Sequence, residues 1–250
     1  MKYMTKEWYQ TMQKTSLHLL LRVTKQAEQF SEGFYRALYE AKENEMVRLW
    51  EEVSKIQLEE PLPYDPETCD PDATRRTFKK NHRANVKYLK DTLPENILQQ
   101  VADIRVLALN CASAAVKRDI TAWCKQNEKA ANQTARGYEK HYNAMLEKGN
   151  PAFLENFSFH DCRVISCRKQ GENLIIGLDN TNGFSDVEAI ILEQCIVLTQ
   201  ETPFRNAWWL YEEIYPVAGG YEIHTLLQNS RMQLIDFIVQ VTGVRFQRGT

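Results

Sequence analysis

The hydrophobic positions of the first 150 residues recur every three or four residues, which is the pattern of helices with one apolar face. The clearest segment opens at Ser31, a residue type that is favoured at helix N-caps. We expect a helix from Ser31 to Lys55 with one stripe buried in a core. This stripe consists of Phe34 or Tyr35, Leu38, Ala41, Met46, Leu49, Trp50, Val53 and Ile56.

An acidic, proline-rich segment follows from Gln57 to Pro71. Repeated prolines cannot continue a helix, because proline lacks the N–H and its ring clashes with the preceding turn, so this segment predicts a loop. Asp70 as N-cap, with Pro71 at the first helical position, then predicts a helix that runs to about Lys90. The apolar side of this helix consists of Phe78, His82, Val86 and Leu89.

Helical spacing resumes at Thr92 and Glu95, which have the spacing of a capping box, and continues to Lys148. We expect one long helix, or two helices joined by a kink among the small residues Ala112–Ala115. Gly149, Asn150 and Pro151 end this region. The first 150 residues therefore predict a helical bundle of about five helices.

From Phe159 onward the period changes to two, which is typical of strands. Phe159–Asp179 predicts a hairpin around Gly171, and Asn182–Gly183 predicts a second tight turn. Because short turns favour antiparallel neighbours, we expect a six-stranded antiparallel β-domain, curled or partly closed. Its later strands are Val187–Leu198, Ala207–Val217, Tyr221–Gln228 and Gln233–Phe246, the last with a kink at Gly243.

The predicted fold class is therefore α+β, with a helical bundle at 1–150 and an antiparallel β-domain at 157–250. A composition of 43% hydrophobic and 26% charged residues suits a globular chain with a core. The net charge of -2 gives no general argument for nucleic acid or an anionic membrane as partner. The predicted β-domain carries seven basic and eleven acidic residues, which favours a basic partner.

Nothing in the sequence favours a membrane or an exported location. No apolar run approaches the roughly 20 residues that a membrane span needs. The N-terminus lacks the layout of a secretory signal, and the six cysteines contain no CxxC pair. We therefore predict a cytoplasmic location and no membrane partner.

Four ionisable residues in the predicted strands are the candidate site of a small metal-dependent hydrolase: His160, Asp161, Glu222 and His224. Such a site needs the strands to bring all four together, because neighbouring residues on a strand point to opposite faces. The alternative is that Asp161 accepts backbone hydrogen bonds in a turn. No helical metal motif, phosphate loop or nucleophile elbow occurs, so we predict no catalytic residue, metal or cofactor.

A run of cations without acids occupies the helix predicted from Asp70 to Lys90. Its members are Arg75, Arg76, Lys79, Lys80, Arg83, Lys87 and Lys90. On the outer side of that helix they could attract phosphates, but the preceding acidic loop could neutralise them. We regard nucleic-acid binding as the less favoured alternative.

The sequence WWLYEEIY at 208–215 has large apolar side chains on both faces of a predicted strand. A period of two places Trp209, Tyr211 and Tyr215 on one face, and Trp208 on the other. The surplus aromatic face must be covered, either by the helical bundle or by a partner or ligand.

Several segments carry a resemblance to a known type of protein: YMTKEWYQTMQKT, FYRALYEAKE, FHDCRVIS and WWLYEEIY…GGYEIHTLL. Together they resemble an uncharacterised bacterial family in which a helical N-terminal part precedes a small β-rich C-terminal part. FHDCRVIS…GENLIIGLDN is also similar to β-domains of uncharacterised bacterial proteins, some grouped with toxin-immunity proteins. The resemblance implies a protein of the bacterial cytoplasm and carries over no catalytic residue.

We therefore expect a non-enzymatic module that binds another protein, with an oligomeric state that the sequence leaves open. The looser resemblance implies that this module is toxin-immunity-like. The helix Ser31–Lys55 and the strand Trp208–Tyr215 would supply aromatic contact surfaces.

Overall fold

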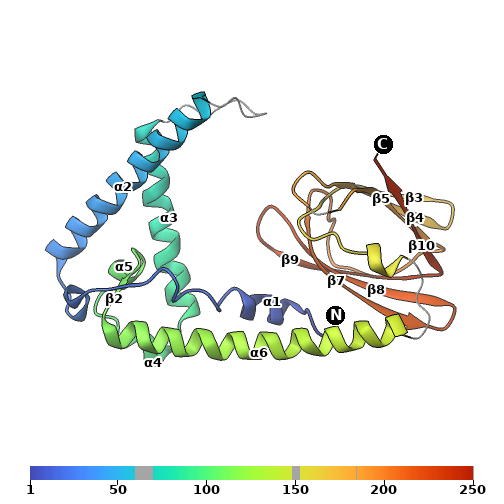
Figure 1. The fold of residues 1–250 in the computed structure, drawn as a ribbon, viewed down its shortest axis with the longest axis horizontal. Coiled ribbons are helices and arrows are strands. Elements are labelled where there is room, and N and C mark those ends of the chain that lie inside the picture. Colours follow the sequence, from blue (N-terminus) through green and yellow to red (C-terminus); the bar gives the residue numbers. More distant parts are fainter. Residues whose placement is uncertain (60–69, 148–152, 184, 250) are drawn as a thin grey trace. The chain divides into compact units, whose positions relative to one another are not determined.

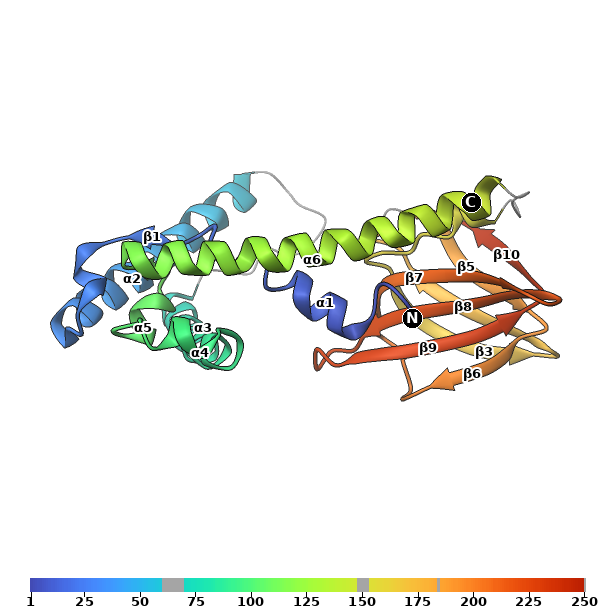
Figure 2. The ribbon, with the colours of Figure 1, turned by 90° about the horizontal axis from the view of Figure 1, so that it is seen from below.

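The structure is a computed structural model that describes residues 1–59, 70–147, 153–183 and 185–249 (Figures 1 and 2). The chain divides into two compact units, Lys14–Asn127 and Met1–Gln13 with Glu128–Thr250. Helix α6 (Ala114–Glu147) crosses the boundary, so its two halves belong to different units. The limits 1–150 and 157–250 for two domains stay a prediction.

The unit Lys14–Asn127 is mainly helical. In chain order it contains β1 (Arg22–Val23), η1 (Lys25–Glu28), α2 (Glu32–Glu59), α3 (Pro71–Thr92), α4 (Glu95–Leu98), α5 (Ile104–Leu107), β2 (Cys111–Ala112) and the first half of α6. Helices α2 and α3 meet through aromatic rings: the centroid of Tyr39 lies 5.1 Å from that of Phe78 and 5.3 Å from that of His82. His82 is buried, as its apolar spacing predicted.

The start of α3 is confirmed. The side chain of Asp70 accepts a hydrogen bond from the backbone N–H of Asp72 at 2.9 Å, and Pro71 is the first helical residue. The rest of the predicted acidic loop, residues 60–69, lies outside the described residues, as does the predicted helix end at Gly149–Pro151.

The prediction of one or two helices over 95–148 is wrong. Two short helices, α4 and α5, and the strand β2 precede α6. The helical pattern breaks because Cys111 and Ala112 pair in parallel with β1, and Asn110 just before them has a φ of 63°. Helix α6 then begins after Ser113, whose hydroxyl accepts a hydrogen bond from the N–H of Val116 at 3.2 Å.

The predicted core stripe of α2 is only partly buried. Leu49, Trp50 and Val53 are 55%, 45% and 40% exposed, whereas Val47 is buried. The reason is that α3 contacts the first half of α2, where Arg75 pairs with Glu43 at 3.1 Å. The helical period was correct, but after Val47 the apolar residues Leu49, Trp50 and Val53 remain exposed.

The other unit contains one large antiparallel sheet. Its elements are α1 (Lys6–Met12), the second half of α6, η2 (Leu154–Asn156), β3 (Arg163–Gln170), β4 (Asn173–Asp179), β5 (Val187–Glu193), β6 (Ile196–Gln200), β7 (Trp208–Val217), β8 (Gly220–Gln228), β9 (Leu234–Val241) and β10 (Gly243–Arg248). The order of hydrogen-bonded neighbours is β10-β5-β4-β3-β7-β8-β9-β6. The predicted hairpin around Gly171 is present as β3 and β4.

The α+β class is confirmed, but over the described residues the sheet has eight strands rather than six and is not closed. Each of two predicted long strands is broken at a corner. Gln194, with a φ of 45°, separates β5 from β6, and Thr242 separates β9 from β10 beside the predicted kink at Gly243. β5 then pairs with β10, while β6 pairs with β9. A strand period cannot reveal such corners, because it is the same on both sides of the bend.

A β-bulge at Leu210 changes which residues of β7 share a face. The register shifts between Trp209 and Tyr211, so Trp209 joins Ile214 in the buried core of the sheet. The opposite face is covered by helices: the ring of Trp8 in α1 lies 5.0 Å from that of Tyr211 and donates a hydrogen bond to the carbonyl of Ala131 in α6. In the part of the chain that the structure describes, no helix has the length and apolarity needed to cross a membrane.

Candidate functional site

His160 and Asp161 form a turn before β3. The Nδ1 atom of His160 contacts the carbonyl oxygen of Leu210, and its ring lies 5.0 Å from the ring of Tyr211. Asp161 has a φ of 65°, and its backbone N–H donates to the carbonyl of Trp209 at 3.0 Å. The two residues therefore hold the segment before β3 against the bulge of β7.

Glu222 and His224 form a second pair on β8. The Nε2 atom of His224 lies 2.5 Å from Oε1 of Glu222, and its ring meets that of Tyr215 edge-on at 5.1 Å. His224 is buried, and its Nδ1 atom has no hydrogen-bond partner among the described residues. This pair faces the helix-covered side of the sheet, opposite Glu213 and Tyr215 in register.

The structure does not join these two pairs. Among the described residues no hydrogen bond, ion pair or ring contact links His160 or Asp161 to Glu222 or His224, and no group of three or more His, Cys, Asp or Glu could hold a metal ion. The functional role of the four residues stays a prediction.

Glu213 is a buried carboxylate that the sequence analysis did not single out. It has no exposed surface, and it accepts hydrogen bonds from the backbone N–H groups of Lys2 at 2.8 Å, Tyr3 at 3.0 Å and Met4. The hydroxyl of Tyr215 donates to it as well. Burial and this hydrogen bond raise the pKa of Tyr215. Glu213 thus fastens residues 2–4 to β7.

The neighbouring Glu212 lies on the opposite face of β7. Its Oε2 atom accepts a hydrogen bond from the indole N–H of Trp209 at 2.7 Å. Burial of the carboxylate raises the pKa of Glu212 to about 7, although the hydrogen bonds from Trp209 and the backbone of Phe159 act in the other direction. A carboxyl group with this pKa changes its charge near neutral pH. The sequence signal for this arrangement was the presence of two adjacent acidic residues in a strand of aromatic and aliphatic residues. A carboxylate buried in such a strand needs a hydrogen-bond donor inside the protein.

The aromatic residues of β7 have internal packing partners. Trp209 is 2% exposed and Tyr215 is 7% exposed, while Trp208 and Tyr211 are half-buried. The aromatic face of this strand was expected to be covered either by helices of the chain or by a partner. In the structure, α1 and α6 cover the side of Tyr211 and Tyr215. A role of the four residues in binding stays a prediction.

The basic run lies on the outer side of α3. Arg75 is half-buried, and the other six cations are exposed. Arg75, Arg76 and Lys87 form ion pairs with Glu43, Asp70 and Asp91. Lys79, Lys80, Arg83 and Lys90 form no ion pair with any described residue, which leaves four cations for an anionic ligand.

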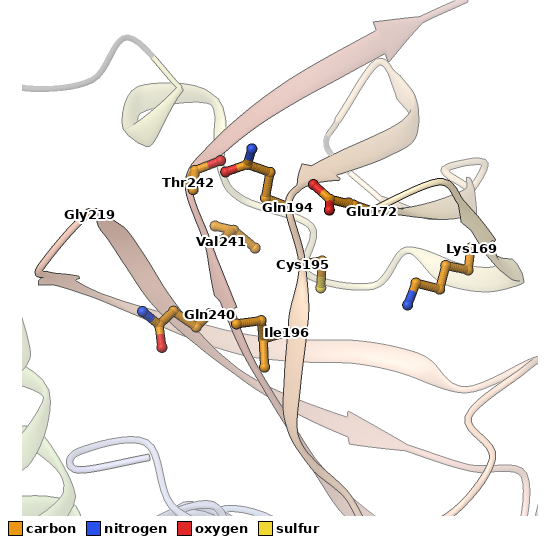
Figure 3. A pocket seen from close by; sticks show the side chains of 9 residues that line it. All are labelled: Lys169, Glu172, Gln194, Cys195, Ile196, Gly219, Gln240, Val241 and Thr242. Atoms are coloured by element: carbon orange, nitrogen blue, oxygen red, sulfur yellow. The ribbon is translucent and has the colours of Figure 1, made fainter.

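The edge strand β6 is the other feature that the sequence analysis missed. Ile196, Val197 and Leu198 are 58%, 44% and 47% exposed. Two cavities of about 400 Å³ and 340 Å³ lie beside its first residues, and both are lined by Lys169, Cys195 and Ile196. In Figure 3 the strand with Cys195 and Ile196 runs between Lys169 and Gln240. Burial raises the pKa of Cys195 to about 11, so its thiol is a poor nucleophile.

A family model described as "Protein of unknown function (DUF4085)" matches residues 75–237, which is more than half of the chain. The chain belongs to this family. The predicted resemblance to an uncharacterised family with helices first and strands later is thereby confirmed. No curated protein and no solved structure matches the chain. The family match therefore supplies no activity, and any function has to be argued from the residues.

The match covers some candidate features and not others. It includes the basic side of α3, both His–acid pairs, β6 and β7. It does not include α2, whose exposed apolar residues Leu49, Trp50 and Val53 we name the α2 face.

Proposed function

We propose that this protein acts by binding another protein, and that the α2 face is a contact surface. The observation that carries this proposal is the exposure of Leu49, Trp50 and Val53 on adjoining positions of one long helix. When a partner covers a patch of water-exposed aliphatic and aromatic groups, the removal of this apolar surface from water favours binding. Tryptophan contributes strongly at such contacts because it buries a large, rigid surface.

The chemistry around the α2 face indicates the kind of partner. The exposed carboxylates of Glu51 and Glu52 and the exposed cations of Arg48 and Lys55 adjoin it, as the polar rim of an interface would. A partner with an apolar groove bordered by charged residues of both signs is complementary to this arrangement. An immunity-like role, implied by the looser sequence resemblance, would make this partner a toxin.

Affinity capture from the native host tests the proposal when three baits are compared. Wild-type protein and Tyr88→Glu should retain the same specific protein, whereas Trp50→Glu should lose it. Tyr88 is the matched control because it is a 40% exposed aromatic residue on the neighbouring helix. With the purified partner, Trp50→Ala should weaken binding by about tenfold or more. Equal binding by Trp50→Glu and the wild type would refute the assignment of the α2 face.

Nucleic-acid binding through α3 is the second candidate, because Lys79, Lys80 and Arg83 are free of ion pairs with described residues. Binding of a labelled oligonucleotide at low salt, lost in Lys79→Glu/Lys80→Glu, would favour it. A hydrolase that uses His160, Asp161, Glu222 and His224 would require a bound metal ion. Among the described residues, these four do not form a group that could hold one. Metal analysis of the purified protein tests that alternative.

The bacterial cytoplasm remains the proposed location. It rests on the sequence resemblance and on the cysteine pattern. Fractionation of the native host with an antibody to the chain would check it.

A further inference from the structure

Within the described ranges, the strand β6 has a partner strand on one side only. It stands at the end of the sheet order and, among these residues, pairs with β9 alone. The backbone N–H and C=O groups on its other side therefore have no strand partner in the described part of the chain. Such an edge recognises extended backbone, because only another strand offers hydrogen-bonding groups at the same repeat.

The side chains of β6 do not protect this edge. Natural edge strands are usually guarded by a lysine, a proline or a bulge. From Gln194 to Gln200 the chain has no charged residue and no proline. A bulge between Val197 and Thr199 is the one protective device present. Ile196, Val197 and Leu198, exposed by about half each, remain available to a second strand.

We propose that β6 pairs with β6 of a second copy of this chain, antiparallel and about a twofold axis. The segment is neutral and aliphatic, so it matches itself without bringing like charges together within the strands. The cavity of about 340 Å³ lined by Leu174, Ile196 and Val197 offers space for an aliphatic side chain of the second strand.

Charges at the ends of the strand support this occupant. Lys169 lines the cavity at the start of β6 and forms no ion pair with any described residue. Glu201 directly follows the end of β6, and its side chain is 43% exposed although it pairs with Lys6 at 2.5 Å and accepts a hydrogen bond from the N–H of Asp236 at 3.1 Å. Antiparallel pairing brings the end of one β6 to the start of the other, and thus Glu201 of the second copy toward Lys169. A short pairing of five residues predicts a weak dimer that forms at micromolar or higher concentration.

Sedimentation velocity on the full chain, from low micromolar to several hundred micromolar, tests the proposal. The wild type should show a concentration-dependent monomer–dimer equilibrium. Leu198→Lys should remain monomeric over the whole range, because it places a charge in the centre of the pairing. Met232→Lys is the matched control: Met232 is a 71% exposed apolar residue in the turn between β8 and β9, and this variant should associate like the wild type.

The proposal is overturned if the wild type stays monomeric at the highest concentration, if Leu198→Lys dimerises like the wild type, or if Met232→Lys also abolishes dimerisation. A monomeric wild type would point to an extended peptide of a different protein. If circular dichroism shows that Leu198→Lys is unfolded, the variant Lys169→Glu tests the proposal instead. It should raise the dissociation constant of the dimer by about threefold, because it places a carboxylate near Glu201 of the second copy. An unchanged dissociation constant would reject the arrangement. This surface is separate from the α2 face, so either proposal can fail alone.

Discussion

Strands β7 and β6 belong to the same sheet, and both carry consecutive large apolar residues, yet their surroundings are opposite. β7 pairs along its length with β8, meets β3 at Trp208 and is covered by α1 and α6. In the part of the chain that the structure describes, β6 pairs with β9 alone, and its three aliphatic residues are exposed. Hydrophobicity alone does not distinguish a strand that stabilises the fold from one that is available for contact; the number of covering neighbours does.

The largest difference in stability is expected between variants of the buried Trp209 and of the exposed Trp50. Its indole is in the core and donates to Glu212, so Trp209→Ala should lower the free energy of unfolding by about 4 kcal/mol through the lost burial and the cavity left behind. Trp50→Ala, at the exposed α2 face, should cost less than about 1 kcal/mol. Urea titrations of both variants measure this. Equal stability of the two would mean that β7 is not a covered strand.

The pH dependence of stability should show the burial of Glu212. The folded pKa of about 7 lies above the ordinary value of 4.5, so the folded protein favours the protonated carboxyl. The protonated carboxyl therefore stabilises the folded protein relative to the ionised one by an amount on the order of 3 kcal/mol. This stabilisation is fully present below pH 4.5 and is lost as the pH rises through 7. Glu212→Gln should flatten the fall of stability over this range in denaturation curves measured at several pH values. An unchanged slope would assign the pH dependence to other groups.

On the helix-covered face of β7, Glu213→Gln should destabilise the protein by about 2 kcal/mol. The variant loses a charged acceptor for the N–H groups of residues 2–4, so hydrogen exchange at these residues should also speed up. Glu222→Gln is the control, because that side chain is 31% exposed and bonds only to His224 among the described residues. Unchanged exchange at residues 2–4 would show that Glu213 does not hold them.

The smallest effect on stability is expected in β6. Ile196→Ser should change the free energy of unfolding by less than about 0.5 kcal/mol, because Ile196 is 58% exposed. Ile223→Ser in β8, where the side chain is 1% exposed, should cost about 3 kcal/mol. A comparable loss for both, measured well below the concentration of any dimer, would mean that β6 is covered within the chain.

Local signals predicted much of the fold. Asp70 and Pro71 marked the start of α3, Gly171 marked the β3–β4 turn, and Gly243 marked the break before β10. The candidate sites were predicted less well. The spacing of His160 and Glu222 said nothing about whether their strands meet, and β6 was taken as the end of a longer strand.

The sequence by itself determined where the long helices α2 and α3 lie and where the chain changes from helical to extended, because these choices depend on neighbours within a few residues. Only the tertiary structure decided which apolar faces are covered. The acceptor of the N–H groups of residues 2–4 is Glu213, more than 200 residues away along the chain. The corner at Gln194 and the bulge at Leu210 likewise depend on which strands become neighbours. An apolar face is buried only when a segment far away in the sequence packs against it. The local hydrophobic period describes one of these two segments and does not identify the other.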